Sequence, residues 1–342
     1  MNLIGEHTDY SGGLALPFAV AYGVTVTARS LAEPLIKARA LDLDEQDSFG
    51  LTAIAPGEGW RAFVRGVAYE LQAGGASLSG AELEITGNLP VGAGLSSSAA
   101  LSLALYLALA AVSGVGDREW IDIARLCQRV EHEWVGAQTG LLDPLASLSG
   151  VAHEAVLIDF QTLELEPVPL DLGGCVLVVL DSGERHTNAD SGYNQRCLEC
   201  AEAAHRMGAE TLRDALIQDL HMLPDTLARR AKHVISENGR VMQAVEAIRD
   251  GNLERLGRLL DASHASLRDD FDVSTPALEA AVAQLKNAGA IGARLIGGGF
   301  GGSVLALMPP DAVAPVGATV VSPMPGAHLL HTPLGGPAVE LG

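Results

Sequence analysis

Hydrophobic and polar positions alternate along two stretches of the first hundred residues, 20–29 and 81–86. Because successive side chains of a β-strand point to opposite faces, this spacing predicts two half-buried strands. A turn rich in glycine and serine follows the second strand, and an apolar run over 99–112 follows the turn. The run carries no charged residue, so it predicts a buried helix.

The rest of the pattern predicts a second half that is mostly helical. An amphipathic helix is expected over 120–135, two short strands within 151–172, and a buried strand over 175–180. Further helices are expected at 194–217, 228–249, 252–266 and 276–287, and an apolar strand at 303–308. Gly173 and Gly174 separate the two halves, so we expect domains at 1–172 and 173–342. The tail beyond Pro309 has no strong period.

The composition is typical of a compact globular chain rather than a disordered one. Apolar residues make up 48% of the 342 positions and charged residues 19%, and the length agrees with two domains. The formal net charge of −20 repels phosphate backbones and anionic lipids, so we expect no nucleic acid partner. A monomer is favoured over an oligomer.

Neither a membrane protein nor a zinc protein is predicted. The apolar run 99–112 is shorter than the ~20 residues that cross a bilayer, and the first residues lack the basic and apolar regions of a signal peptide. We therefore expect no membrane span and a cytosolic location. Cys197 and Cys200 form one CxxC without a second ligand pair, so we interpret them as reduced helix residues.

Residues 90–99, Pro-Val-Gly-Ala-Gly-Leu-Ser-Ser-Ser-Ala, form the most informative stretch for chemistry. Gly92 and Gly94 allow a ligand to approach the backbone closely. The serines open a helix whose first N–H groups have no partner within the helix, which favours anion binding. A serine cap on a core helix would explain one serine and one glycine but not the whole set. The stretch therefore predicts a phosphate-binding loop.

Two common nucleotide-binding loops are excluded. A Walker A loop needs a lysine after its last glycine, and none of the three lysines, Lys37, Lys232 and Lys286, follows a glycine. Residues 297–302 satisfy G-x-G-x-x-G, but an apolar strand follows them where the NAD-binding fingerprint needs a helix. This match is therefore false.

Three stretches fit one known pattern when taken in order. They read Asn-Leu-Ile-Gly-Glu-His-Thr-Asp-Tyr at 2–10, Pro-Val-Gly-Ala-Gly-Leu-Ser-Ser-Ser-Ala-Ala at 90–100, and Gly-Ala-Arg-Leu-Ile-Gly-Gly-Gly-Phe-Gly-Gly at 292–302. They resemble the signature motifs of the galactokinase family within the GHMP kinase superfamily, the first being the most specific. Shorter matches at 140–143, 191–196 and 263–270 extend the resemblance from residue 1 to about 307.

The resemblance implies an α+β protein with the two-domain GHMP kinase fold. Its N-terminal domain would be ribosomal protein S5 domain 2-like and its C-terminal domain ferredoxin-like. The implied activity is ATP-dependent phosphorylation of D-galactose at the anomeric hydroxyl, giving galactose 1-phosphate for galactose catabolism, with Mg²⁺ as cofactor. Kinase activity on arabinose or N-acetylgalactosamine stays open, as does a sensor that binds galactose and ATP without turnover.

The resemblance also assigns roles to residues. Asp143 is the implied catalytic residue, which takes the proton from the sugar hydroxyl or orients that oxygen. Ser98 and Glu131 are the implied Mg²⁺ ligands. The implied ATP-phosphate loop consists of Gly92, Ala93, Gly94, Leu95, Ser96, Ser97 and Ser98. The implied sugar-binding residues are Glu6, His7, Thr8, Asp9 and Tyr193.

The chain departs from the family pattern at its first residue. The family reads Gly-Arg-Val before Asn-Leu-Ile-Gly-Glu-His, and its arginine stabilises charge in the transition state. Here Met1 stands at the valine position. Because a GUG codon gives Met as a start and Val elsewhere, we expect the upstream DNA to encode Gly-Arg and another strand. Arg29 and Arg294 are candidates to compensate; otherwise we expect the chain as written to bind both ligands with little turnover.

Overall fold

The computed structural model describes residues 1–88, 97–184, 189–331 and 337–340 and divides them into two compact units. Unit 1 contains 1–20 and most of 150–324, whereas unit 2 contains 21–88, 97–149 and the described residues after 324. The units therefore do not follow the expected ranges 1–172 and 173–342. The reason is strand pairing, because β1 (Leu14–Ala15) lies antiparallel to β6 (Glu154–Asp159) and joins the N-terminus to unit 1.

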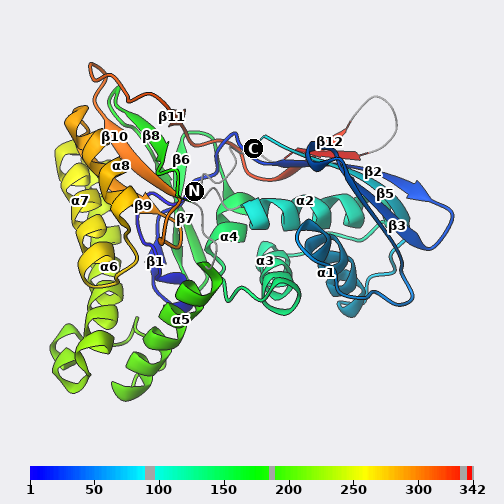
Figure 1. Cartoon of the computed structure of the whole chain (residues 1–342), viewed down its shortest axis with the longest axis horizontal. Helices are drawn as coiled ribbons and strands as arrows, with labels where there is room; N and C mark the ends of the chain where they lie inside the picture. Colours follow the sequence, from blue (N-terminus) through cyan, green and yellow to red (C-terminus); the bar gives the residue numbers. More distant parts are fainter. Residues whose placement is uncertain (89–96, 185–188, 332–336, 341–342) are drawn as a thin grey trace. The chain divides into compact units, whose positions relative to one another are not determined.

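Unit 2 is built on a six-stranded sheet in the order β12-β13-β2-β5-β3-β4. Its strands are β2 (Val24–Leu31), β3 (Leu35–Ala40), β4 (Glu45–Gly50), β5 (Gly80–Gly87), β12 (His328–His331) and β13 (Pro337–Glu340). Figure 1 shows α1 (Trp60–Ala73) and α2 (Ser97–Val112) along one face of this sheet, with α2 against β2. The alternating burial of β2 and β5 and the buried helix α2 confirm the sequence predictions for these elements.

The rest of unit 2 is helical and includes one unusual turn. Helix α3 (Trp120–Arg129) continues into a π-helical turn over Val130–Val135, and α4 (Leu142–Ser149) follows. The turn ends at Gly136, whose φ of 89° lies in the left-handed region. The predicted helix over 120–135 is thus present, but its last turn is wider than an α-helix and so changes the direction of its side chains.

Unit 1 contains a four-stranded antiparallel sheet in the order β11-β8-β10-β9. Its strands are β8 (Val176–Asp181), β9 (Gly292–Ile296), β10 (Ser303–Met308) and β11 (Thr319–Val321). Every residue of β9 and β10 is buried, which explains the uninterrupted apolar run that predicted a strand at 303–308. A smaller sheet, β1-β6-β7, ends in the edge strand β7 (Glu164–Pro169). The two prolines of β7 have no N–H group to donate, which an edge strand tolerates and a central strand does not.

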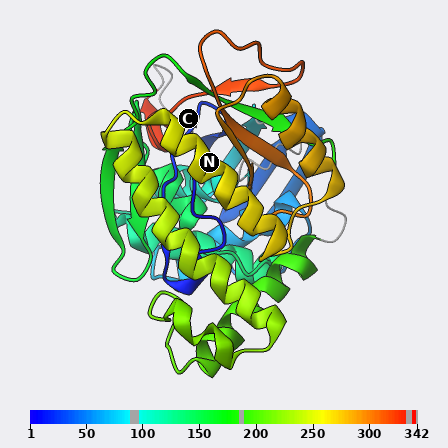
Figure 2. The ribbon, with the colours of Figure 1, turned by 90° about the vertical axis from the view of Figure 1, so that its left-hand side faces the viewer.

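Helices α5 (Ala189–Arg206), α6 (Asp225–Arg249), α7 (Leu253–Asp269) and α8 (Pro276–Asn287) complete unit 1. Figure 2 shows the long helices of this unit lying across its strands, and an apolar core of the four helices and the sheet lies between them. Asn252 and Thr275 cap α7 and α8 through their side-chain oxygens. The expected helix 194–217 is wrong at its end, because Gly208 at φ 69° turns the chain soon after Arg206.

The tail beyond Pro309 contributes strands that its pattern does not reveal. β11 pairs with β8 in unit 1, and β13 pairs with β2 in unit 2. Within the described part of the chain, no helix has the length and apolarity needed to cross a membrane.

Helix α7 approaches β9 unusually closely through two facing glycines. A Cβ on Gly257 would lie 2.5 Å from Cγ2 and 2.7 Å from the carbonyl oxygen of Ile291, and one on Gly292 would lie 2.2 Å from the Gly257 carbonyl oxygen. Ordinary contacts begin near 3.4 Å, so neither position accepts a larger residue without movement of the backbone. The close approach sets the position of the chain that follows Gly292.

We expect Gly257→Ala to lower the free energy of unfolding by about 1–3 kcal/mol, because α7 must move away from β9. Helix propensity alone predicts the opposite sign, a gain of about 0.5–1 kcal/mol. Gly239→Ala on α6 is the matched control, since nothing lies within 4 Å of its Cβ position and only the propensity gain applies. Urea denaturation measures both, and equal effects at the two positions would contradict the close-approach argument.

Candidate active site

The 5–14 loop of unit 1 contains the predicted sugar-binding residues and has an unusual backbone. Gly5 has φ 104° and His7 has φ 60°, a left-handed value that costs a residue with a side chain. Thr8 is fully buried, and its hydroxyl lies 2.9 Å and 2.8 Å from the carbonyl oxygens of Gly5 and Leu14. We therefore interpret Thr8 as a residue that shapes the loop. Asp9 is half-buried and begins a short 3₁₀ turn, Asp9–Ser11.

Glu6 is tied to the glycine-rich turn that follows β9. Its Oε1 accepts a hydrogen bond of 2.9 Å from the Gly297 N–H and lies 3.2 Å from the Arg294 guanidinium. Arg294 is fully buried and also donates to the carbonyl oxygens of Asn2 and Leu3, at 3.2 Å and 3.0 Å. The first and third motifs are thus joined by a buried ion pair.

This arrangement bears on the expectation that Arg29 or Arg294 takes the role of the arginine that precedes the first motif in the family pattern. Arg294 binds the N-terminal segment of unit 1 through Glu6 and two carbonyl groups. Arg29 lies on the exposed surface of unit 2 and pairs with Glu82. Each guanidinium already has protein partners, so the structure supports neither as a substitute.

His7 is a buried, neutral side chain with a fixed tautomer. Its Nε2 donates to the Gly298 carbonyl oxygen at 3.2 Å, and its Nδ1 accepts from the Tyr10 hydroxyl at 2.8 Å. Burial, followed by the nearby His233, lowers the pKa of His7 from 6.5 to about 3. The ring centroids of Tyr193 and Phe271 lie 5.2 Å and 4.7 Å from that of His7. Tyr193 is thereby placed beside the 5–14 loop, as its predicted role requires.

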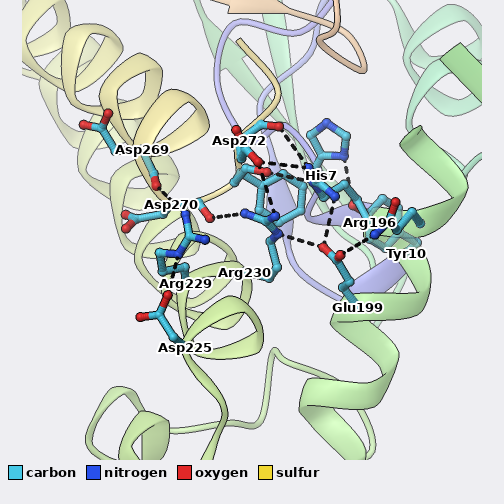
Figure 3. A network of polar contacts seen from close by, with 12 residues as sticks. His7, Tyr10, Arg196, Glu199, Asp225, Arg229, Arg230, Asp269, Asp270 and Asp272 are labelled. Atoms are coloured by element: carbon cyan, nitrogen blue, oxygen red, sulfur yellow. Dashed lines mark hydrogen bonds and ion pairs between the residues drawn. The ribbon is translucent and has the colours of Figure 1, made fainter. Parts of the chain in front are cut away.

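Two buried arginines hold Phe271 against this histidine (Figure 3). Arg196 donates to the Phe271 carbonyl oxygen at 2.8 Å and to that of Asp272 at 3.0 Å. Arg230 donates to the Asp270 carbonyl oxygen at 2.7 Å. Glu199 lies between the two guanidinium groups and accepts from both, at 3.1 Å and 2.7 Å. The pair therefore fixes the backbone of 270–272, which carries a left-handed residue, Asp272 at φ 58°.

In unit 2 the structure brings together the predicted metal-binding and catalytic residues. Glu131 lies in the π-helical turn, is 6% exposed, and accepts hydrogen bonds from the Ser98 and Thr139 hydroxyls. Burial raises the pKa of Glu131, and the nearby Asp143 carboxylate raises it further. Asp143 is half-buried in the first turn of α4. Four oxygen-bearing side chains from separate elements thus share one neighbourhood.

Thr139 completes this group, and the sequence analysis missed it. The side chains of Gln128 and His132 both donate to its carbonyl oxygen, at 3.0 Å and 2.8 Å, which fixes the segment after the π-helical turn. Its hydroxyl can then reach Glu131. A threonine eight residues after a glutamate gives no signal of this in the sequence.

The oxygen donors fit Mg²⁺, the ion that the family resemblance implies. Mg²⁺ prefers oxygen ligands and usually takes only one or two from protein, the rest coming from water and phosphate. A buried carboxylate surrounded by hydroxyls and a second carboxylate is an electrostatic environment that a cation relieves. Among the residues that the structure describes, no cluster of three or more His, Cys, Asp or Glu could hold a metal alone.

The phosphate-loop residues Gly92, Ala93, Gly94, Leu95 and Ser96 lie outside the described residues. Ser97 and Ser98 are the first two residues of α2, so the predicted start of this helix is confirmed to within two residues. The N–H groups of its first turn lack partners in the helix and favour an anion.

The fold and the first two motifs define a kinase of the GHMP superfamily. The family model for the N-terminal domain of GHMP kinases matches residues 62–151, and that for their C-terminal domain matches residues 244–325. A mevalonate kinase structure superposes with a TM-score of 0.65 at 18% identity, covering 95% of this chain and 96% of the other, which shows the same fold. The expected two-domain GHMP kinase fold is therefore confirmed.

More specific matches then narrow the class. The galactokinase galactose-binding signature matches residues 1–30. Galactokinases of Mycobacterium tuberculosis and Mycobacterium bovis are 41% identical to the chain over 329 residues, which is 94% of this chain and 90% of each relative. The structure of Lactococcus lactis galactokinase complexed with galactose superposes with a TM-score of 0.89 at 32% identity, covering 95% and 92% of the two chains. This chain belongs to the galactokinase family.

The buried histidines predict a pH-dependent stability. Unfolded His7 and His233 protonate near 6.5, whereas their folded pKa values are about 3 and about 4. Between pH 5.5 and 4.5 the unfolded chain therefore binds more protons, and the free energy of unfolding falls as the pH is lowered. His233→Gln should flatten this slope by roughly 1.4 kcal/mol per pH unit, the value for one proton. Urea denaturation across this range measures the slope, and an unchanged slope in the variant would contradict it.

Proposed function

We propose that this chain transfers the γ-phosphoryl group of ATP to the anomeric hydroxyl of D-galactose, giving galactose 1-phosphate and ADP. The observation that carries the proposal is the 41% identity to galactokinases over 94% of the chain, together with the galactose-binding signature at residues 1–30. The close superposition on a galactokinase that was solved with galactose supports the choice of sugar. The reaction is a step in galactose catabolism.

The sugar is proposed to bind at the 5–14 loop of unit 1. A neutral ligand rich in hydroxyl groups needs several hydrogen-bonding side chains in fixed positions, and Glu6, His7, Asp9 and Tyr193 offer carboxylate, imidazole and phenol groups. The neutral His7 adds no charge that galactose would have to balance. The contacts of Glu6 and His7 with the glycine-rich turn hold both side chains in place.

ATP and Mg²⁺ are proposed to bind in unit 2. The phosphates would lie at the N-terminal end of α2, where the first N–H groups have no partner within the helix and favour anions. The family resemblance adds residues 92–98 to this phosphate site. Ser98 and Glu131 would hold Mg²⁺, which neutralises the charge that develops on the phosphate oxygens when bound. Thr139 orients the Glu131 carboxylate through its hydroxyl.

Asp143 is proposed as the catalytic residue. As the anomeric oxygen attacks the γ-phosphorus, the bond to ADP breaks, and the hydroxyl proton passes to the Asp143 carboxylate. Asp143 lies beside Glu131, so the proposed base and the proposed metal ligand belong to the same neighbourhood of unit 2.

The comparisons favour neither a sensor without turnover nor a sugar other than galactose. We place the reaction in the cytoplasm, where ATP is available and where the four cysteines, which form no disulfide, would stay reduced. A monomer remains the proposed state.

Asp143→Asn tests the catalytic assignment. The amide keeps the size of the side chain but accepts a proton poorly, so phosphorylation should fall by about 10²-fold or more while galactose and ATP still bind. Asp122→Asn, an exposed carboxylate on α3, is the matched control and should keep full activity. A coupled ADP-release assay with galactose, glucose, arabinose and N-acetylgalactosamine measures the rates. Unchanged turnover in Asp143→Asn would refute the assignment.

Asp9→Ala tests the sugar site. Removal of a carboxylate that binds ring hydroxyls should weaken galactose binding by about 1–3 kcal/mol and leave ATP affinity nearly unchanged. Asp311→Ala removes an exposed carboxylate of the same unit and should affect neither ligand. Calorimetric titration with each ligand measures both affinities, and equal weakening of the two would mean that the 5–14 loop has a structural role instead.

A further inference from the structure

Helix α6 presents three polar side chains to the backbone of the 5–14 loop. The Gly5 N–H donates to Glu237 Oε1 at 3.1 Å, the Glu6 carbonyl oxygen lies 3.1 Å from His233 Nε2, and the Leu14 N–H donates to Asn238 Oδ1 at 2.9 Å. His233 and Glu237 are four positions apart and share one face of the helix, and Asn238 follows Glu237 directly. These contacts reach both ends of the loop and its strained centre.

Glu237 is suited to this position because its described partners are all donors. It is fully buried and accepts from the Ser263 hydroxyl at 2.5 Å and from Arg240 Nε at 2.5 Å, in addition to the Gly5 N–H. A carboxylate offers only acceptor sites, whereas an amide would turn an N–H₂ group toward one of these donors. The charge of Glu237 is balanced by Arg240.

His233 binds the loop with a defined tautomer. Its Nδ1 faces the Ser266 hydroxyl at 2.9 Å, and its Nε2 donates to the Glu6 carbonyl oxygen. The centroid of the Phe271 ring lies 4.6 Å from that of His233 and 4.7 Å from that of His7. The helix therefore fixes the peptide group of Glu6 at the same place where Phe271 fixes the ring of His7.

Such bonds are needed because the loop is strained. The left-handed backbone of His7 is unfavourable for a residue with a side chain and persists only where the surroundings hold it. The Glu6 carbonyl group directly precedes His7, so the His233 bond acts on the peptide unit that leads into the strained residue. Without this bond, the loop could relax and move the side chains of Glu6 and His7.

We propose that His233, Glu237 and Asn238 are positioning residues for galactose, which set the affinity of the 5–14 loop for the sugar without touching it. The motif at 263–270 would then support the loop indirectly, since Ser263 orients Glu237 and Ser266 orients His233. The proposal rests on the assignment of the sugar site to this loop.

A pair of substitutions at one position provides the test. His233→Leu keeps the bulk of the side chain but removes the donor, whereas His233→Gln retains an N–H that reaches the Glu6 carbonyl oxygen. We expect His233→Leu to raise the galactose KM at least tenfold while the ATP KM changes less than twofold. His233→Gln should restore the galactose KM to within about threefold. Hydrogen–deuterium exchange should show faster exchange of the peptide covering residues 1–16 in His233→Leu alone.

Leu285→Ala serves as the control for lost stability. This fully buried leucine of α8 lies in the same core and makes no hydrogen bond to the loop. Its loss should lower the urea midpoint of unfolding and leave the galactose KM unchanged. In case His233→Leu does not fold, the test is repeated at the half-buried Asn238. Asn238→Ala removes the acceptor of the Leu14 N–H and should raise the galactose KM, whereas Asn238→Asp keeps an acceptor oxygen and should not.

The outcomes separate this proposal from the proposed function. If the unsubstituted chain phosphorylates galactose, and His233→Leu and Asn238→Ala both keep its galactose KM, the positioning role alone is overturned. Parallel changes in the galactose and ATP KM values would also overturn it, because they indicate general loss of structure. An unsubstituted chain that does not bind galactose would refute the proposed function, and this role with it.

Discussion

The guanidinium of Arg294 is fully buried where the first residues of the chain meet strand β9. Taking a charge out of water costs several kcal/mol unless opposite charge and hydrogen bonds replace the lost hydration. Glu6 supplies the charge, and the carbonyl oxygens of Asn2 and Leu3 supply the bonds. Removal of either charged partner would leave the other buried and uncompensated, so the N-terminal segment and the glycine-rich turn are bound to each other. The geometry of Glu6 and His7 follows from this constraint.

Two buried glutamates illustrate how surroundings separate a structural carboxylate from a binding one. Arg240 and His233 help to lower the pKa of Glu237 to about 2 despite its burial, so its charge is already satisfied within the protein. Glu131 has hydroxyl partners and a neighbouring carboxylate, and its pKa is raised. A cation would stabilise the charged form of Glu131, which is the property expected of a Mg²⁺ ligand. The same residue type therefore has a lowered pKa in unit 1 and a raised pKa in unit 2.

Periodicity predicted the elements whose burial is regular, such as α2, β5 and the strand at 303–308. It missed the hairpin of β3 and β4 and the late strands β11 and β13, whose formation depends on pairing with distant strands. The motifs located the loops of the candidate site. They did not reveal that Arg294, Glu237 and Arg196 hold those loops, because burial of a charged side chain depends on partners far away in the sequence. Units 1 and 2 are each built from separate segments of the chain for the same reason, because strands far apart in the sequence pair within them.

The contacts of the 5–14 loop also determine when it can form during synthesis. Its residues are translated before their partners, because the bonds of Glu6 to His233 and Gly297 span 227 and 291 residues. Contacts of such long range form slowly, because closing the intervening chain costs entropy before any bond compensates for it. The loop therefore leaves the ribosome before α6 and the glycine-rich turn, and its contacts are complete only after both have been made. Maturation of the 5–14 loop is a late event that follows assembly of β9 and α6 rather than the order of the sequence.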